Sequence, residues 1–239
     1  MDTFSVPPRL NKVLYVCFLV TGLYLLLSTS VAQVTNLDDA GPGSLRDVMA
    51  AAADGDTITF QAGLSGTINT ASELNTALPN LTIDATGATI TVDGQGTHRV
   101  FNHTSNGTFT IINMTIQNGN AGGGDGGGVR SNRNIAILNS TVTNNRAGRD
   151  GGGISGRDIT VTNSTVSDNV ADDSGGGIEG QDVVVTNSTV SGNRSETEDG
   201  GGILSRDNTT IISSRVFGNR TRLVGGAASS TSSKATLMR

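Results

Sequence analysis

The chain has 239 residues, of which 33 are glycine, with two tyrosines, no tryptophan and a formal net charge of −5. The scarcity of aromatic residues argues against a globular core of large rings and favours a narrow core of Ile, Val and Leu. The acidic balance argues against nucleic-acid binding, which requires a basic face.

Residues 1–32 are typical of a secretory signal. Arg9 and Lys12 supply a positive start, residues 13–27 form an unbroken apolar or small run, and residues 30–32 match a small-x-small cleavage site. We expect cleavage after this site. The alternative is an uncleaved membrane anchor, because Ser and Thr extend the run toward the length of a membrane span.

The only cysteine, Cys17, lies inside the apolar run. It lacks the small residues expected before a lipidated cysteine, so the sequence argues against a lipoprotein. The cleaved chain would then contain no disulfides and no thiol chemistry.

Residues 33–56 are expected to form an N-terminal cap. A possible strand over 34–37 precedes Ser44, whose side chain can cap a helix that runs to about Ala53, before Gly55. Such a helix would cover the open sheet edge at this end, which would otherwise recruit other chains. Its apolar face consists of Leu45, Val48, Met49 and Ala52.

Residues 57–228 are expected to form a solenoid, with a first strand at 56–60 and degenerate turns over 61–125. Alternation of apolar and polar residues predicts strands at 81–83, 90–92, 109–111 and 114–116. The four phenylalanines of this part are expected in the core: Phe60, Phe101, Phe109 and Phe217.

Three phrases recur every 24 to 26 residues from Gly126 onward, and a fixed period in the twenties means stacked repeats. A Gly-Gly-Gly phrase starts at Gly126, Gly151, Gly175 and Gly200. An Asn-Ser-Thr-Val phrase starts at Asn139, Asn163 and Asn187, with a degenerate copy at Ser213. A single asparagine closes each unit: Asn145, Asn169, Asn193 and Asn219.

Each unit offers three short strands and no segment apolar enough for a helix. Stacked units can bury their apolar faces in parallel register about 4.8 Å apart, so the sequence predicts an all-β, right-handed parallel β-helix with three strands per turn. The expected columns are Ile135/Ile159/Val183, Ile137/Val161/Val185/Ile211, Val142/Val166/Val190/Val216 and Val129/Ile154/Ile178/Ile203. An amide ladder is expected at Asn113, Asn139, Asn163 and Asn187.

Two family resemblances follow from these phrases. The glycine phrase alternating with Val-x-x-Asn resembles the repeats of chlamydial-type polymorphic outer-membrane proteins over roughly residues 126–228, with Val where that family has Phe. Residues 43–46 followed by 55–60 are similar to the cap of secreted bacterial β-helix proteins of the pectin-lyase-like class. The resemblance implies fold and export, and it does not imply a reaction.

No catalytic constellation is recognisable in the sequence. Enzymes of the class that the chain resembles act on acidic polysaccharides, with clustered acidic groups and a base. The pair Asp172-Asp173 fits a turn, because sister units carry Asp125, Asp150 and Asp199 there. His98 could act as a base, although a histidine in a surface turn is the more frequent case.

Three aspartates, Asp158, Asp182 and Asp207, are expected in the same turn of successive units. Carboxylates stacked about 5 Å apart repel one another unless compensated. One interpretation is a solvated corner balanced by Arg157 and Arg206, and the other is a Ca²⁺ ladder on the three carboxylates. No other cofactor is expected.

The sequence therefore predicts an exported bacterial β-helix, secreted or on the cell surface, with a structural or adhesin-like role. Host or cell-surface glycans or proteins are the expected partners, and contact with a membrane is expected only through the signal or a missing C-terminal region. The alternatives are a polysaccharide lyase or glycoside hydrolase, and a fragment of a longer autotransporter-like passenger. Residues 229–239 are expected to be a disordered tail or a truncation point.

Overall fold

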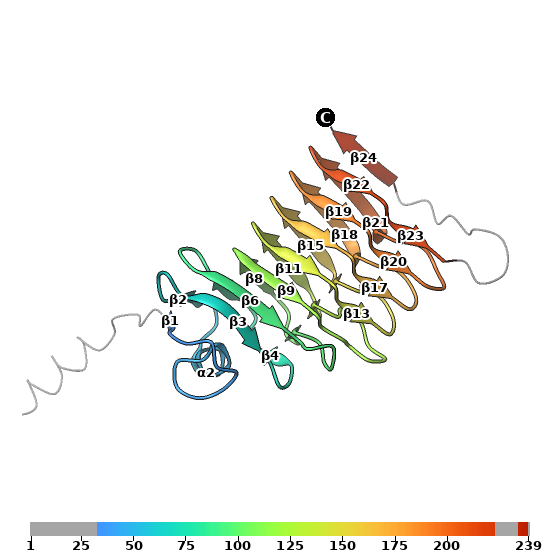
Figure 1. The fold of residues 1–239 in the computed structure, drawn as a ribbon. Helices are drawn as coiled ribbons and strands as arrows, with labels where there is room; N and C mark the ends of the chain where they lie inside the picture. The colour runs from blue at the N-terminus through green and yellow to red at the C-terminus, as the bar shows by residue number, and fades with distance from the viewer. Residues whose placement is uncertain (1–32, 223–233, 239) are drawn as a thin grey trace, which may run out of the picture. The chain divides into compact units, whose positions relative to one another are not determined.

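The computed structural model describes residues 33–222 and 234–238, the latter as backbone only. The expected signal at 1–32 lies outside these residues. The described part is an all-β parallel solenoid of about eight turns, as the sequence predicted (Figure 1). Every strand pairing in it is parallel, and its right-handed sense stays a prediction.

The largest sheet has 13 strands, and the long strand β18 (Ile178–Thr186) joins its two rows. One row contains β4 (Leu74–Thr76), β7 (Phe101–His103), β10 (Val129–Ser131) and β14 (Ile154–Ser155). The other contains β1 (Gln33–Val34), β2 (Thr57–Phe60), β5 (Leu81–Asp84), β8 (Thr108–Ile112), β11 (Asn134–Leu138) and β15 (Asp158–Thr162). After β18 follow β21 (Ile203–Ile212) and β24 (Lys234–Met238).

Two smaller sheets complete each turn. The seven-stranded sheet contains β3 (Ser65–Asn69), β6 (Thr89–Asp93), β9 (Met114–Gln117), β12 (Thr141–Thr143), β16 (Thr165–Ser167), β19 (Thr189–Ser191) and β22 (Arg215–Phe217). The four-stranded sheet contains β13 (Arg146–Ala147), β17 (Val170–Ala171), β20 (Arg194–Ser195) and β23 (Arg220–Thr221). The sequence missed β3, β4 and β7, and it also missed the four-stranded sheet, because it expected three strands in each unit. Residues 234–238, which the sequence placed in a disordered tail or at a truncation point, pair as β24 with β21.

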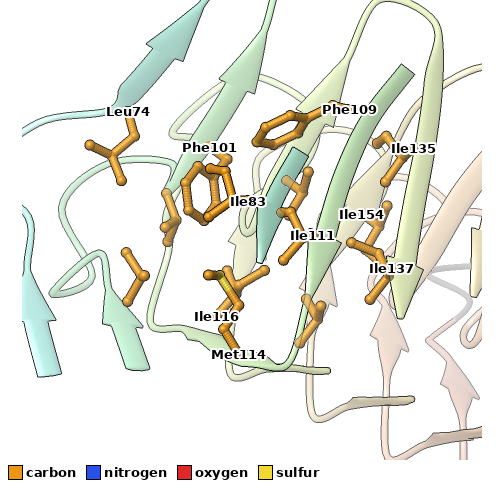
Figure 2. Close-up of a cluster of buried hydrophobic side chains, with 14 of the residues drawn as sticks. Leu74, Ile83, Phe101, Phe109, Ile111, Met114, Ile116, Ile135, Ile137 and Ile154 are labelled. Atoms are coloured by element: carbon orange, nitrogen blue, oxygen red, sulfur yellow. The ribbon is translucent and has the colours of Figure 1, made fainter. Parts of the chain in front are cut away.

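The four predicted columns are confirmed residue by residue. The register places Ile154 against Ile178 and Ile178 against Ile203, and the other three columns pair in the same way. Figure 2 shows three members of these columns, Ile135, Ile137 and Ile154, in one buried cluster with Phe101 and Phe109, whose ring centroids lie 5.6 Å apart. Phe60 is also buried. The core position expected for Phe217 was wrong, because that side chain is 57% exposed.

The N-terminal cap contains the short helix that the sequence predicted. Helix α2 (Leu45–Ala51) begins after Ser44, whose hydroxyl accepts a hydrogen bond from the backbone N of Asp47 at 3.2 Å. Leu45 and Met49 are buried, and the helix ends two residues earlier than expected. Strand β1 covers one edge of β2, so part of the sheet edge at this end is paired.

Outside the glycine phrase, each regular turn bends at two corners with left-handed backbone. The first corner holds Asn139, Asn163 and Asn187, with φ of 48°, 51° and 50°, and the second holds Asn144, Asp168 and Gly192, with φ of 55°, 56° and 68°. Asn, Asp and Gly tolerate this conformation better than other residues do. The recurring asparagine of the Asn-Ser-Thr-Val phrase is therefore a corner residue.

The main amide ladder lies at other asparagines than predicted. Asn145 and Asn169 are buried, and Oδ1 of Asn169 accepts hydrogen bonds from both the backbone N and Nδ2 of Asn145, each at 3.0 Å. Asn193 and Asn219 continue the same pattern. In the predicted ladder the only bond between successive asparagines runs from Asn163 Nδ2 to Asn139 Oδ1, at 3.2 Å in an exposed position.

A second buried ladder consists of serines. Oγ of Ser164 accepts from the backbone N of Ser140 at 3.1 Å and donates to the carbonyl of Thr162 at 2.7 Å. Ser188 and Ser214 repeat this arrangement. The two ladders satisfy backbone groups at the corners, where no strand partner is available.

The three glycines of each phrase have three different roles. The first, such as Gly151, has φ of +63°. A Cβ on the second, Gly152, would collide with backbone atoms of Gly176 and Val170. A Cβ on the third, Gly153, would lie 2.8 Å from the carbonyl oxygen of Gly177 and 3.0 Å from the amide of Asn169. The phrase therefore lets the chain pass directly over the next turn and over the asparagine ladder.

Candidate functional site

The three aspartates expected to form a Ca²⁺ ladder do not share one register. Asp158 pairs in register with Asp182, but Asp182 pairs with Asn208. The register shifts after Gly180, so the last unit has one residue more on its strand and Asp207 falls into this bulge. Nδ2 of Asn208 donates to Oδ1 of Asp182 at 2.8 Å. The placement of Asp207 in the carboxylate stack was therefore wrong.

The two arginines expected to balance this corner are placed differently. Nε of Arg157 lies 4.0 Å from Oδ1 of Asp158, and both side chains are about half exposed. Arg206 turns instead to Glu179 and Asp150. Within the residues that the structure describes, no group of three or more His, Cys, Asp or Glu side chains is arranged to hold a metal ion.

The second predicted acidic turn is confirmed by its backbone bonds. The N of Gly126 donates to the carbonyl of Asp150, and the N of Gly175 donates to the carbonyl of Asp199, at 2.9 and 3.1 Å. Ser174 occupies this position in the unit between Asp150 and Asp199. Asp172 of the preceding pair forms an ion pair with Arg146, which agrees with the turn role expected for it.

A charged cluster joins this turn to the outer face of the large sheet. Arg206 donates from Nε to Glu179 Oε1 at 2.9 Å and from Nη2 to Asp150 Oδ2 at 3.4 Å, and Ser155 Oγ donates to Glu179 Oε2 at 3.0 Å. Burial raises the pKa of Asp150, and Glu179 raises it further, against the hydrogen bond from Ser174 N and the charge of Arg206. The hydrogen bond to Glu179 raises the pKa of Arg206. These hydrogen bonds connect Asp150 and Ser155 with Glu179 in the next turn and Arg206 in the turn after it.

A related cluster in the degenerate turns was missed by the sequence reasoning. The mostly buried Arg99 donates from Nη1 to Glu73 Oε1 at 2.8 Å and from Nε to the carbonyls of Asp125 and Gly126 at 3.0 Å. Burial lowers the pKa of Arg99, and Glu73 opposes that shift. The irregular spacing of these turns left no repeat signal that would have paired Glu73 with Arg99.

Both histidines are held by structural hydrogen bonds. The ring nitrogens of His98 lie 2.9 Å from the hydroxyls of Thr70 and Thr97. The fully buried His103 lies 2.8 Å through Nε2 from the carbonyl of Leu78, so Nε2 is the donor and Nδ1 accepts from Ser131 at 2.7 Å. These contacts engage all four ring nitrogens within the fold.

A broad polar groove is a candidate site for ligand binding. It has a volume of about 710 Å³ and is lined by Asn69, Asp93, Gln95, Gly96, Asn118, Gly119, Asn120, Asn144 and Arg146. Its residues come from the ends of β3, β6, β9 and β12 and from the start of β13, so the groove crosses four successive turns. Four of them, Gln95, Gly96, Asn118 and Asn144, have left-handed backbone, and three of these four carry a side-chain amide.

Asp93 accepts three hydrogen bonds in and beside the groove. Its Oδ2 accepts from Gln117 Nε2 and Asn118 Nδ2, both at 2.8 Å, and its Oδ1 accepts from the backbone N of Gln95 at 2.7 Å. Burial raises the pKa of Asp93, but these three hydrogen bonds together lower it below its usual value. The result is a surface of fixed amide donors and acceptors around a charged carboxylate.

The fold and these surfaces define a parallel β-solenoid with polar outer corners. No family model, curated protein or solved structure matches the chain. Over residues 33–222 and 234–238, no helix is both long and apolar enough to cross a membrane.

Proposed function

We propose that the chain is an exported bacterial scaffold, secreted or displayed at the cell surface, with a structural or adhesin-like role. The observation that carries this proposal is the pair of continuous buried ladders, because each rung fixes its neighbour through side-chain bonds at the corners. Such turns form a stiff support for a long polar surface.

The groove around Asp93 is the part of that surface suited to a glycan. Amide, carboxylate and guanidinium groups are the partners that bind sugar hydroxyls, and the left-handed corners hold three of the amides in fixed positions. The residues lining the groove offer no aromatic ring for stacking, so we expect weak, multivalent binding.

Export is tested first, by expressing the chain with its own first 32 residues in a bacterium and separating the cell fractions. The proposal requires the chain outside the cytoplasm and accessible to protease on intact cells. Retention in the cytoplasm would contradict it. A uronate-release assay on the same material tests the enzyme alternative, and robust turnover would replace the scaffold role.

Glycan binding is tested on an array with Asn144→Gly, which removes an amide of the groove while the left-handed backbone stays allowed. The matched control is Asn163→Gly, which makes the same change at a corner outside the groove. We expect the first variant to lose binding and the second to keep it. Equal loss in both variants would contradict a role for the groove.

A further inference from the structure

The last complete turn differs in character from the turns before it. On the outward face of the seven-stranded sheet, residues of successive turns stand in register. Arg215 of β22 occupies the position held by Thr141, Thr165 and Thr189 in earlier turns. Phe217 occupies the position held by Thr143, Ser167 and Ser191. Val216 and Phe217 are 43% and 57% exposed, and they are the exposed large hydrophobic residues of the described part of the chain. An aromatic side chain thus replaces small polar ones at the solvent face.

Two strands of this turn have one strand neighbour each within residues 33–222 and 234–238. In their sheets β22 pairs with β19 and β23 pairs with β20, whereas β21 pairs with both β18 and β24. Asn219 accepts the ladder bonds from Asn193 and is the last rung of the amide ladder among the described residues.

The balance of charged residues is acidic near the N-terminal cap and basic in the turn at 203–222. Between residues 33 and 112 the only basic residues are Arg46 and Arg99, and both are paired, with Asp39 and Glu73. Residues 203–222 contain one acidic residue, Asp207, and four arginines: Arg206, Arg215, Arg220 and Arg222. The side chains of Arg215 and Arg220 are exposed and form no ion pair among the described residues.

Helix α2 of the cap lies at the end of the solenoid opposite β22 and β23 (Figure 1). The cap carries exposed carboxylates at Asp38, Asp47 and Asp54, and Ala50 and Ala51 of α2 are exposed as well. The two alanines can pack against Phe217 and Val216 of another copy. The carboxylates of the cap can then accept hydrogen bonds from the arginines near Phe217 and Val216.

We infer that the turn at 203–222 binds the N-terminal cap of a second copy of this chain. The two surfaces differ, so the contact is heterologous and repeats, and the copies form open head-to-tail filaments. Assembly in this direction extends the scaffold beyond the length of one chain and repeats its groove along the filament.

Sedimentation velocity on the purified exported chain tests the inference. We expect larger species that grow with protein concentration at about 0.02 M salt and shrink at about 0.5 M, because screening weakens exposed charge pairs. A chain that stays monomeric at low salt and about 100 μM, a concentration at which weak interfaces are populated, would overturn it.

Charge reversal at each end gives the sharper test. The tail variant carries Arg215→Glu and Arg220→Glu, and the head variant carries Asp38→Lys and Asp47→Lys; all four side chains are exposed. We expect each variant alone to associate at least about tenfold more weakly than the wild type, because like charges then meet. An equimolar mixture of the two should associate again.

The matched control is Arg149→Glu with Arg157→Glu, the same charge change on exposed side chains of earlier turns. We expect the control to associate like the wild type. Association that survives in the tail variant, or a mixture that stays monomeric, would overturn the assignment of the two surfaces. Circular dichroism of every variant confirms that the fold is kept.

Discussion

Oδ1 of Asn169 accepts two hydrogen bonds from Asn145 in the adjacent turn, one from the backbone N and one from Nδ2, each at 3.0 Å. Nδ2 of Asn169 in turn donates to the carbonyl of Val142 at 3.0 Å. One buried amide thus satisfies two backbone groups, the N of Asn145 just after β12 and the carbonyl of Val142 within β12. This relationship repeats in each regular turn, and it makes the corner as well connected as the strands.

Asn169→Ala should destabilise the solenoid severely. The substitution leaves the backbone N of Asn145 and the carbonyl of Val142 without these partners in a buried site, and we expect a loss of more than about 3 kcal/mol. Asn163→Gly is the control, at an exposed corner of the same turn, and should change stability by less than about 1 kcal/mol. Urea unfolding of both variants checks this, and similar losses would contradict a special role for the buried ladder.

Gly152→Ala should be almost as damaging, for a steric reason. The added Cβ would collide with the backbone of Gly176 and Val170, so two turns would have to separate, at a cost of about 2–5 kcal/mol. Gly123→Ala adds the same methyl group where nothing lies within 4 Å, and should be neutral within about 0.5 kcal/mol. Thermal unfolding compares the two variants, and equal melting temperatures would refute the close approach.

The core columns could be predicted from the sequence because apolar alternation and a fixed period determine register. The amide ladder was assigned to the wrong asparagines because both sets recur with the same period. A signal was nevertheless present: the expected ladder position changes to Ser213 in the last unit, whereas the closing position of that unit keeps its amide at Asn219. A position that loses its amide in one unit is less constrained by amide hydrogen bonds than a position that keeps it.

Other features had no comparable signal in the sequence. The bulge that displaces Asp207 follows from one extra residue among polar neighbours, and alternation of apolar residues cannot locate it. The exposure of Phe217, by contrast, follows from strand alternation, because Val216 belongs to a predicted inward column and the next residue lies on the opposite face. The groove around Asp93 is formed by degenerate turns, and their irregular spacing gives no repeat signal that would align the lining residues.

Asp150→Asn should stabilise the protein at neutral pH. The folded-state pKa of Asp150 is raised above its usual value, chiefly by burial, so the native state prefers the protonated form. Its favourable contribution is present below the ordinary aspartate pKa and is lost as pH rises through the folded-state value. The variant keeps the Oδ1 acceptor for Ser174 N at 3.1 Å. Its advantage in melting temperature should grow with pH across that window and vanish in acid.

Asp93→Asn should have the opposite pH signature. The pKa of Asp93 is lowered in the folded state, so its contribution is present above the ordinary aspartate pKa and is lost as pH falls through the folded-state value. The amide that replaces the carboxylate would bring a donor toward those of Gln117 and Asn118. We expect destabilisation at neutral pH that shrinks in acid, and the same melting curves check it. A deficit independent of pH would rule out the charge as its cause.

A calcium chelator should leave the melting temperature of the wild type unchanged. Nδ2 of Asn208 donates to Oδ1 of Asp182, so an amide donor stands where the ladder would need a third carboxylate. Asn208→Asp supplies that carboxylate beside Asp182, and stacked like charges should lower the melting temperature in chelator. Added Ca²⁺ should then restore it in this variant alone, with Asn163→Asp, an equivalent charge change at an exposed corner, as the control. A chelator-sensitive wild type would show instead that Asp158 and Asp182 hold the ion with other ligands.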